Sequence, residues 1–132
     1  MKNPYRSIEC IDNERVVLKG PGEAYIHANF IKNLDGKKLF IGTQGPTRDS
    51  APDFWRMVVQ EKSTVIIMLC NIFEEDEKDG NIKEKSVQYW PSTVGKSFKY
   101  DDLEVSCLEI VEISYGVEGQ IIVTTTLELI KS

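Results

Sequence analysis

The sequence predicts a mixed α+β fold with more strand than helix. Apolar and polar residues alternate over residues 24–31, 102–113 and 120–130, which is the pattern of β-strands. Only residues 50–62 space their apolar side chains along one face of a helix. With 41% hydrophobic and 28% charged residues, the chain of 132 residues is typical of a globular protein. We expect one domain over residues 1–132, or part of one, and no second domain.

Charge and composition exclude several classes of function. The net charge of −5 disfavours a nucleic-acid-binding surface, which requires a basic patch. No run approaches the roughly 18 apolar residues of a membrane-spanning helix, and residues 1–10 lack the apolar core of a signal peptide. Three cysteines leave one unpaired in any disulfide scheme, which is typical of a reducing compartment. The sequence therefore predicts a cytoplasmic protein without a membrane segment, and it indicates no cofactor.

The amino-terminal part is expected to form a hairpin followed by a helix. Residues 24–31 and 39–44 are strands joined by the turn sequence LDGKK. A Gln-Gly-Pro turn then leads into the one main helix, over about 50–62. Ser50 is suited to cap the amino end of this helix, and Asp53 stands three residues later, where a capping box places its acid.

The rest of the chain is predicted to be largely β. Residues 63–70 are short, β-branched and apolar throughout, which indicates a strand buried on both faces and hence a mixed sheet. The charge-dense run at 74–85 is expected to be a solvated loop, and 86–90 a short strand. Strands at 102–113 and 120–130 form an antiparallel hairpin. One helix cannot cover a sheet of this size, so we expect an incomplete domain.

Seven segments of the chain occur in one order and carry unusual combinations of residues. They are KNPYRSI, DNERVVL, AYIHANFI, IGTQGP, DFWRMV, VIIMLC and KSVQYWP, and they extend from Lys2 to Pro91. Together they resemble the amino-terminal half of the classical protein-tyrosine-phosphatase domain, and the strand pair up to Ile130 fits the next part of that domain. The resemblance implies removal of phosphate from phosphotyrosine, with a phosphotyrosine-containing protein as partner.

The catalytic residues of that family cannot be located in this chain. The family uses a cysteine nucleophile in H-C-x-x-G-x-x-R, whose backbone N–H groups and arginine bind phosphate, and an aspartate general acid in a W-P-D loop. The sequences after Cys10, Cys70 and Cys107 lack the required glycine and arginine. Trp90-Pro91 is followed by Ser92, not by aspartate. The resemblance therefore implies a segment truncated before both loops, and we expect this chain alone to be inactive.

The resemblance assigns substrate contacts to Tyr5, Arg6 and Lys85. Tyr5 would stack on the phosphotyrosine ring and set a pocket depth that shorter phosphoserine cannot span. Arg6 would attract acidic peptides, and Lys85 would reach toward the active site and its mobile acid loop. Each has a plainer interpretation, a surface aromatic for Tyr5 and a solvated cation for the other two. An acid of 74–77 would hold the phosphate-binding arginine, but the sequence does not distinguish among the four acids there.

Several residues depart from the family pattern. Ser7 replaces an aspartate that binds the substrate backbone, and a neutral hydroxyl makes weaker hydrogen bonds than a carboxylate. Ala24 replaces an acidic residue and Ser86 a cysteine. His27 replaces an asparagine, and we interpret it as a hydrogen-bonded strand residue, because no second histidine or cysteine lies nearby in sequence to share a metal.

Four other residues of the resemblance are interpreted as scaffold. Gly45 and Pro46 would shape the turn before the helix, with the glycine permitting positive φ. Trp55 would belong to the core, and Arg56 would pair with a nearby acid.

Two functions remain open at this point. The first is part of an active tyrosine phosphatase, and the second is a non-catalytic relative, or pseudophosphatase, that binds without catalysis. An incomplete domain leaves apolar surface uncovered, which favours self-association of the isolated chain.

Overall fold

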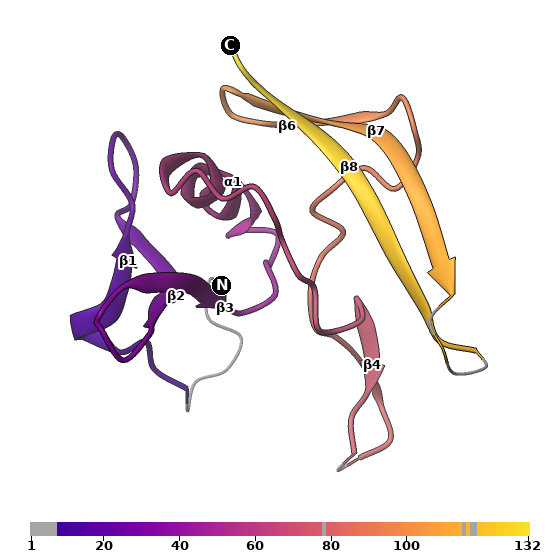
Figure 1. The fold of residues 1–132 in the computed structure, drawn as a ribbon, viewed down its shortest axis with the longest axis horizontal. Helices are drawn as coiled ribbons and strands as arrows, with labels where there is room; N and C mark the ends of the chain where they lie inside the picture. The colour runs from indigo at the N-terminus through magenta and orange to yellow at the C-terminus, as the bar shows by residue number, and fades with distance from the viewer. Residues whose placement is uncertain (1–7, 78, 115, 117–118) are drawn as a thin grey trace. The chain divides into compact units, whose positions relative to one another are not determined.

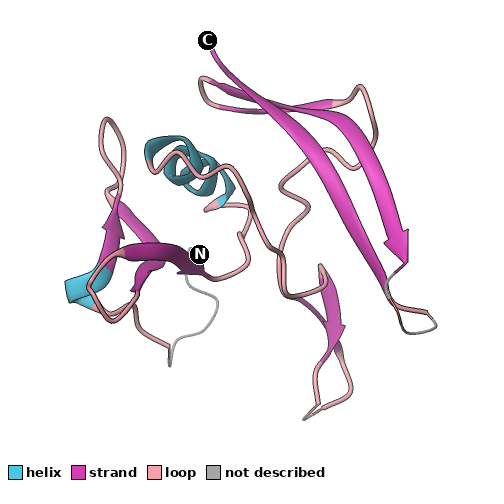
Figure 2. Cartoon of the chain, viewed as in Figure 1, coloured by secondary structure: helices cyan, strands magenta, loops and turns pink. Residues whose placement is uncertain are grey.

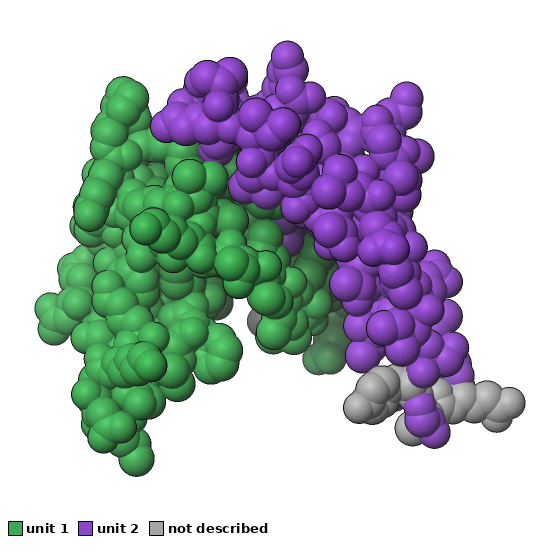
Figure 3. Space-filling model, turned by 45° about the horizontal axis from the view of Figure 1, so that its top comes forward, with its two compact units in different colours: residues 1–87 green, residues 88–132 purple. Residues whose placement is uncertain are grey.

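The computed structural model describes residues 8–77, 79–114, 116 and 119–132. Over these residues it contains one α-helix and eight short or long strands, as predicted for a mixed α+β fold (Figure 2). The strands form three sheets in which every described pairing is antiparallel, so the predicted mixed sheet does not form there. The chain divides into two compact units, 1–87 and 88–132, which Figure 3 colours separately.

The first unit is built on a three-stranded sheet with β2 in the middle (Figure 1). A single 3₁₀ turn, η1 (Asp12–Glu14), leads into β1 (Arg15–Val17). β2 (Tyr25–Lys32) and β3 (Lys38–Thr43) form the predicted hairpin. β2 alternates as its sequence suggests, with Ile26 and Ala28 buried while His27 and Asn29 are half-buried.

Helix α1 (Ala51–Gln60) lies within the predicted range. Its buried positions recur at helical spacing and are Ala51, Asp53, Phe54, Trp55, Met57 and Val58. The predicted cap is wrong: Ser50 has helical dihedral angles and makes no side-chain cap hydrogen bond. Instead the Ser50 hydroxyl accepts the Thr47 N–H at 2.9 Å and so closes the preceding turn. The acid of the expected capping box, Asp53, lies beside Arg56.

The predicted buried strand at 63–70 is absent, and this is the largest error of the sequence-based prediction. These residues have no strand pairing, and Val65, Ile67 and Leu69 are exposed by 72% or more. A strand buried on both faces needs neighbours that supply hydrogen bonds and cover its side chains. None of the described strands takes that place.

The charged run at 74–85 is more ordered than a plain loop. β4 (Phe73–Glu75) and β5 (Ile82–Glu84) form a two-stranded hairpin. Lys83 joins its two sides through ion pairs of 2.7 Å to Asp76 and 3.1 Å to Asp79. The dense charge therefore stabilises a turn as well as keeping it in solvent.

The second unit is a meander of β6 (Ser97–Tyr100), β7 (Leu103–Ser114) and β8 (Ile121–Lys131). β7 and β8 are the predicted long hairpin, with Val105 opposite Leu129 and Cys107 opposite Leu127. The short strand predicted at 86–90 does not form. The Tyr100 hydroxyl instead donates to the Tyr89 carbonyl at 3.0 Å, which ties this irregular segment to β6.

Candidate functional site

Of the three predicted substrate contacts, only Lys85 lies within the described residues. Tyr5 and Arg6 lie outside the described residues, so their role stays a prediction. Lys85 is described and half-buried, directly after β5.

Lys85 lines a groove within the first unit. The groove is formed by the end of β3, the extended segment after α1 and the start of the β4–β5 hairpin. Its lining residues are Ile41, Gly42, Thr43, Gln44, Gly45, Ile67, Leu69, Cys70, Glu74 and Lys85. Apolar side chains from β3 and 67–69 thus stand beside one ammonium and one carboxylate group.

Close backbone packing fixes Lys85 at this groove. A Cβ atom on Gly45 would lie 2.6 Å from the Lys85 carbonyl oxygen, which is far inside van der Waals contact. The Val87 N–H donates to the Pro46 carbonyl at 2.8 Å, and the Lys85 N–H donates to the Ile72 carbonyl at 2.8 Å. Gly45 is therefore required for close approach, and it is absent from the glycines with positive φ.

Of the four acids at 74–77, Glu74 is the one that lines the groove. Glu74 is half-buried and lines the groove, and its Oε1 accepts the Asn71 N–H at 2.8 Å. Glu75 and Glu77 are exposed, while Asp76 pairs with Lys83 outside the groove. Strand alternation in β4 was the available signal, because it turns Glu74 and its neighbour to opposite faces.

The two lysines nearest the groove, Lys83 and Lys85, differ in whether they form ion pairs. No residue in the described ranges forms an ion pair with Lys85. Lys83, two positions earlier, has its pKa raised above 10.5 by hydrogen bonds from its ammonium to Asp76 and then Asp79. The pKa of Asp79 is lowered below 3.8, first by a hydrogen bond from the Asn81 backbone and then by Lys83. Of these two lysines, Lys85 is thus the one placed to meet an anionic ligand.

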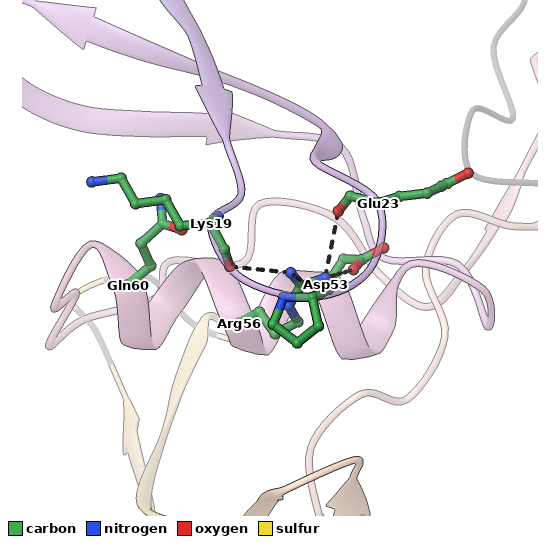
Figure 4. A network of polar contacts seen from close by, with 6 residues as sticks. Lys19, Glu23, Asp53, Arg56 and Gln60 are labelled. Atoms are coloured by element: carbon green, nitrogen blue, oxygen red, sulfur yellow. Dashed lines mark hydrogen bonds and ion pairs between the residues drawn. The ribbon is translucent and has the colours of Figure 1, made fainter.

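Arg56 pairs with a nearby acid, as the sequence predicts, and that acid is Asp53. Their ion pair is 2.8 Å long, and Trp55 between them in sequence is fully buried. Arg56 also donates to backbone carbonyls of the loop that joins β1 to β2, at 2.8 Å to Pro21 and 3.3 Å to Lys19 (Figure 4).

Gln60 extends the same attachment one helical turn further. Its Nε2 donates to the Val17 carbonyl at 3.0 Å, and its Oε1 accepts the Lys19 N–H at 2.8 Å. One face of α1 therefore binds the backbone of residues 17–21, and this holds the helix to the sheet.

The cysteines show no phosphate-binding loop. The Cys10 thiol donates to the Asn29 side-chain oxygen at 3.1 Å, Cys107 is buried, and Cys70 lines the groove. The groove lining contains neither arginine nor histidine. Among the described residues there is also no group of three or more histidine, cysteine or acidic side chains placed to bind a metal. In the same part of the chain, no helix has the length and apolar character to span a membrane.

A family model described as protein-tyrosine phosphatase matches residues 1–130. The chain belongs to the protein-tyrosine phosphatase family. It is 39% identical over 118 residues to a Lar-like tyrosine-protein phosphatase of Caenorhabditis elegans. The aligned region covers 86% of this chain and 5% of that protein. The human non-receptor type 5 enzyme is 35% identical over 116 residues, or 83% of this chain and 19% of the relative. The human tyrosine-protein phosphatase non-receptor type 12 is 36% identical over 110 residues, which are 80% of this chain and 13% of that relative.

This tyrosine-phosphatase chain spans between 5% and 19% of the length of those relatives. The predicted membership of the tyrosine-phosphatase family is confirmed, since the match extends over nearly all of the chain.

Proposed function

We propose that this chain is the amino-terminal part of a phosphatase domain that removes phosphate from phosphotyrosine in proteins. The observation that carries the proposal is the groove in which Lys85 and Glu74 stand together in a chain of this family. An ammonium group at such a groove attracts a phosphoryl group, and a nearby carboxylate can orient a second cation that binds the same phosphate.

On this proposal the chain supplies the wall of the substrate site and not its chemistry. Tyr5 and Arg6 would contact the substrate, and Lys85 would face the reacting groups. The nucleophilic cysteine, the phosphate-binding arginine and the general acid would come from sequence beyond these 132 residues. The 132-residue chain alone is therefore inactive.

A comparison of two preparations tests this function. Hydrolysis of a phosphotyrosine peptide is measured for the 132-residue chain and for the native protein that contains it. We expect vanadate-sensitive turnover from the native protein and none from the chain alone. Vanadate-sensitive turnover by the chain alone would overturn the division of roles. A native protein that binds the peptide without turnover would support the alternative, a pseudophosphatase.

Two of the departures from the family pattern are side chains that have hydrogen-bond partners within the fold. The Ser86 hydroxyl is within hydrogen-bond reach of the Val87 carbonyl at 3.1 Å, and His27 contacts the Ile8 carbonyl at 3.2 Å. Both substituted side chains are thus satisfied within the fold, so they do not by themselves indicate a degenerate site.

The proposal also includes a cytoplasmic location and self-association of the isolated chain. The odd number of cysteines supports a reducing, cytoplasmic setting. Membership of the tyrosine-phosphatase family supports a role in signalling. Exposed apolar side chains at 65–69 support self-association of the isolated chain. Sedimentation velocity at several concentrations tests the second point, and a monomer at all of them would contradict it.

A further inference from the structure

The turn that joins β2 to β3 is held by several hydrogen bonds and carries a leucine at its apex. The Gly36 N–H donates to the Asn33 carbonyl at 3.0 Å, and the Asn33 N–H donates to the Lys37 carbonyl at 2.9 Å. The Asn33 side-chain oxygen also accepts the N–H groups of Asp35 at 3.1 Å and of Lys37 at 2.8 Å. Gly36 has a φ of +79°, which glycine adopts without strain. These contacts fix the turn around Leu34, whose side chain is fully exposed.

Three more apolar side chains of the hairpin are exposed behind this apex. Ile31, Leu39 and Phe40 each keep half or more of their surface in solvent. Ile31 lies opposite Phe40 in the β2–β3 register, so these two side chains stand next to each other on one face of the sheet. Single exposed apolar residues are ordinary, but four of them around one turn are gathered as they are at interaction sites.

The hairpin has a charge opposite to that of the chain. Residues 31–40 contain three lysines and one aspartate and so carry a net charge of +2, whereas the whole chain carries −5. Lys32 forms an ion pair of 2.8 Å with Glu14. The one acid, Asp35, accepts a side-chain N–H of its own turn at 3.3 Å. The local charge is thus suited to an anionic partner.

Two of these lysines have no carboxylate beside them. Lys37 and Lys38 are exposed, and neither forms an ion pair with any residue that the structure describes. The Lys38 ammonium lies 3.4 Å from the centroid of the Phe30 ring, a contact that holds the side chain without neutralising its charge. Two ammonium groups therefore follow the apolar apex closely in the chain.

A lipid surface fits this combination better than a protein groove does. Anionic headgroups attract lysines, and the boundary between headgroups and acyl chains accepts leucine and aromatic side chains. The aliphatic stems of lysines can lie in that boundary while their ammonium groups stay among the headgroups. Because Leu34 protrudes fully into solvent, a protein would need a matching apolar pocket with an acidic rim, whereas lipids rearrange around the side chain.

We propose that the tip of the β2–β3 hairpin, residues 31–40, binds the surface of an anionic phospholipid membrane. Leu34 enters the headgroup region, and Lys37 and Lys38 bind lipid phosphates. The contact is peripheral and reversible, because so small an apolar tip supplies less than stable anchoring requires. It does not depend on the proposed phosphatase activity, and it is compatible with the cytoplasmic location proposed above, since the cytoplasmic leaflet carries anionic lipids.

The test measures cosedimentation of the native protein that contains residues 1–132 with lipid vesicles. Vesicles of phosphatidylcholine alone are compared with vesicles that also contain phosphatidylserine. The variants are Leu34→Ser and the double variant Lys37→Gln with Lys38→Gln. The Tm of each variant is measured without lipid.

Matched controls change the same kinds of side chain elsewhere. Leu108→Ser replaces another exposed leucine. The double variant Lys96→Gln with Lys99→Gln removes the same charge from two exposed lysines at β6. These controls separate the hairpin from general adsorption of the protein to lipid.

A fluorescent reporter at the apex gives a local measurement. Leu34→Trp is mixed with vesicles whose phospholipids are brominated on the acyl chains, and quenching of its emission shows that the apex has entered the membrane. The unsubstituted protein gives the background from Trp55 and Trp90. The local measurement is needed because other parts of the native protein are also free to bind lipid.

We expect tighter binding to the vesicles that contain phosphatidylserine. Loss of the two lysines should weaken this binding by roughly 25-fold, because each lysine contributes roughly fivefold near an anionic surface. Leu34→Ser should weaken it by roughly tenfold and leave Tm unchanged, because its side chain is exposed in the protein and buried only in the membrane. The control variants should bind as the native protein does, and Leu34→Trp should be quenched.

Each other outcome would overturn the proposal. Hairpin variants that bind as the native protein does, or controls that lose as much binding as they do, would show that the hairpin is not the contact. Cosedimentation without quenching at position 34 would place the contact elsewhere. Binding to neither kind of vesicle would favour an acidic protein segment as the partner. Reduced self-association of Leu34→Ser without a change in vesicle binding would assign the hairpin to a second copy of the chain.

Discussion

Helix α1 and the segment after it are both rich in apolar residues, yet they end in opposite environments. Phe54, Trp55, Met57 and Val58 are at most 7% exposed, whereas Val65, Ile67 and Leu69 are at least 72% exposed. A helix makes its own backbone hydrogen bonds and needs only one packing surface, and Arg56 and Gln60 hold α1 to the backbone of residues 17–21. An extended segment needs neighbouring strands as well. Apolar sequence therefore leads to burial only where the fold provides the second surface.

The largest expected effect comes from removing the centre of the packed region. Trp55→Ala deletes a fully buried indole that packs edge-to-face against Phe54 with ring centroids 5.5 Å apart. We expect a loss of about 3–5 kcal/mol in the free energy of unfolding, because a large cavity remains. Urea unfolding of the chain measures the loss. A change below about 1 kcal/mol would show that α1 is not part of a cooperative core.

Breaking the polar attachment of the helix should have the next largest effect. Arg56→Met keeps the apolar stem but leaves the carboxylate of Asp53, a residue 7% exposed, without its 2.8 Å ion pair. It also frees the Lys19 and Pro21 carbonyls. We expect a loss of about 2–3 kcal/mol in the free energy of unfolding, again measured in urea.

A double variant sharpens that second prediction. Arg56→Met combined with Asp53→Asn also removes the buried carboxylate charge that lost its ion pair with Arg56, so part of the stability should return. If the double variant is less stable than Arg56→Met by the full cost of the second change, the two residues act independently and the interpretation fails.

The exposed segment should be insensitive to the same kind of change. Leu69→Ser alters a side chain that is 94% exposed, so the free energy of unfolding of the 132-residue chain should change by less than about 0.5 kcal/mol. The substitution should instead reduce self-association, measured by sedimentation velocity at matched concentrations. A loss of stability comparable to that of Trp55→Ala would mean that 63–70 packs in solution as the sequence predicted.

The smallest effect concerns the charged hairpin of β4 and β5. The pKa of Asp79 is lower in the folded chain than its ordinary 3.8, so its contribution to stability is present above pH 3.8 and lost as the pH falls through the folded value. Asp79→Asn should therefore lower Tm slightly at pH 6 and have no effect in strong acid. Lys83 is exposed to solvent, so 1 M salt should weaken the effect further. A Tm difference that persists unchanged at low pH would contradict the assignment.

Much of the architecture followed from the sequence, because it depends on local pattern. The period of 3.6 residues placed α1, and alternation placed β2 and the β7–β8 hairpin. The turn sequence after β2 placed β3. The family resemblance likewise needed only the order of short motifs, and the match over residues 1–130 confirms it. These features are set by residues close together in the chain.

Only the tertiary structure decided the features that depend on distant neighbours. Residues 63–70 have the composition of a buried strand, but strand formation requires partners that the described chain does not provide. Glu74 lines the groove because of the face that β4 presents there. The need for glycine at position 45 and the hydrogen bonds of His27 and Asn29 to residues 8–11 depend on segments distant in sequence. A sequence states which groups are present, and packing decides which of them meet.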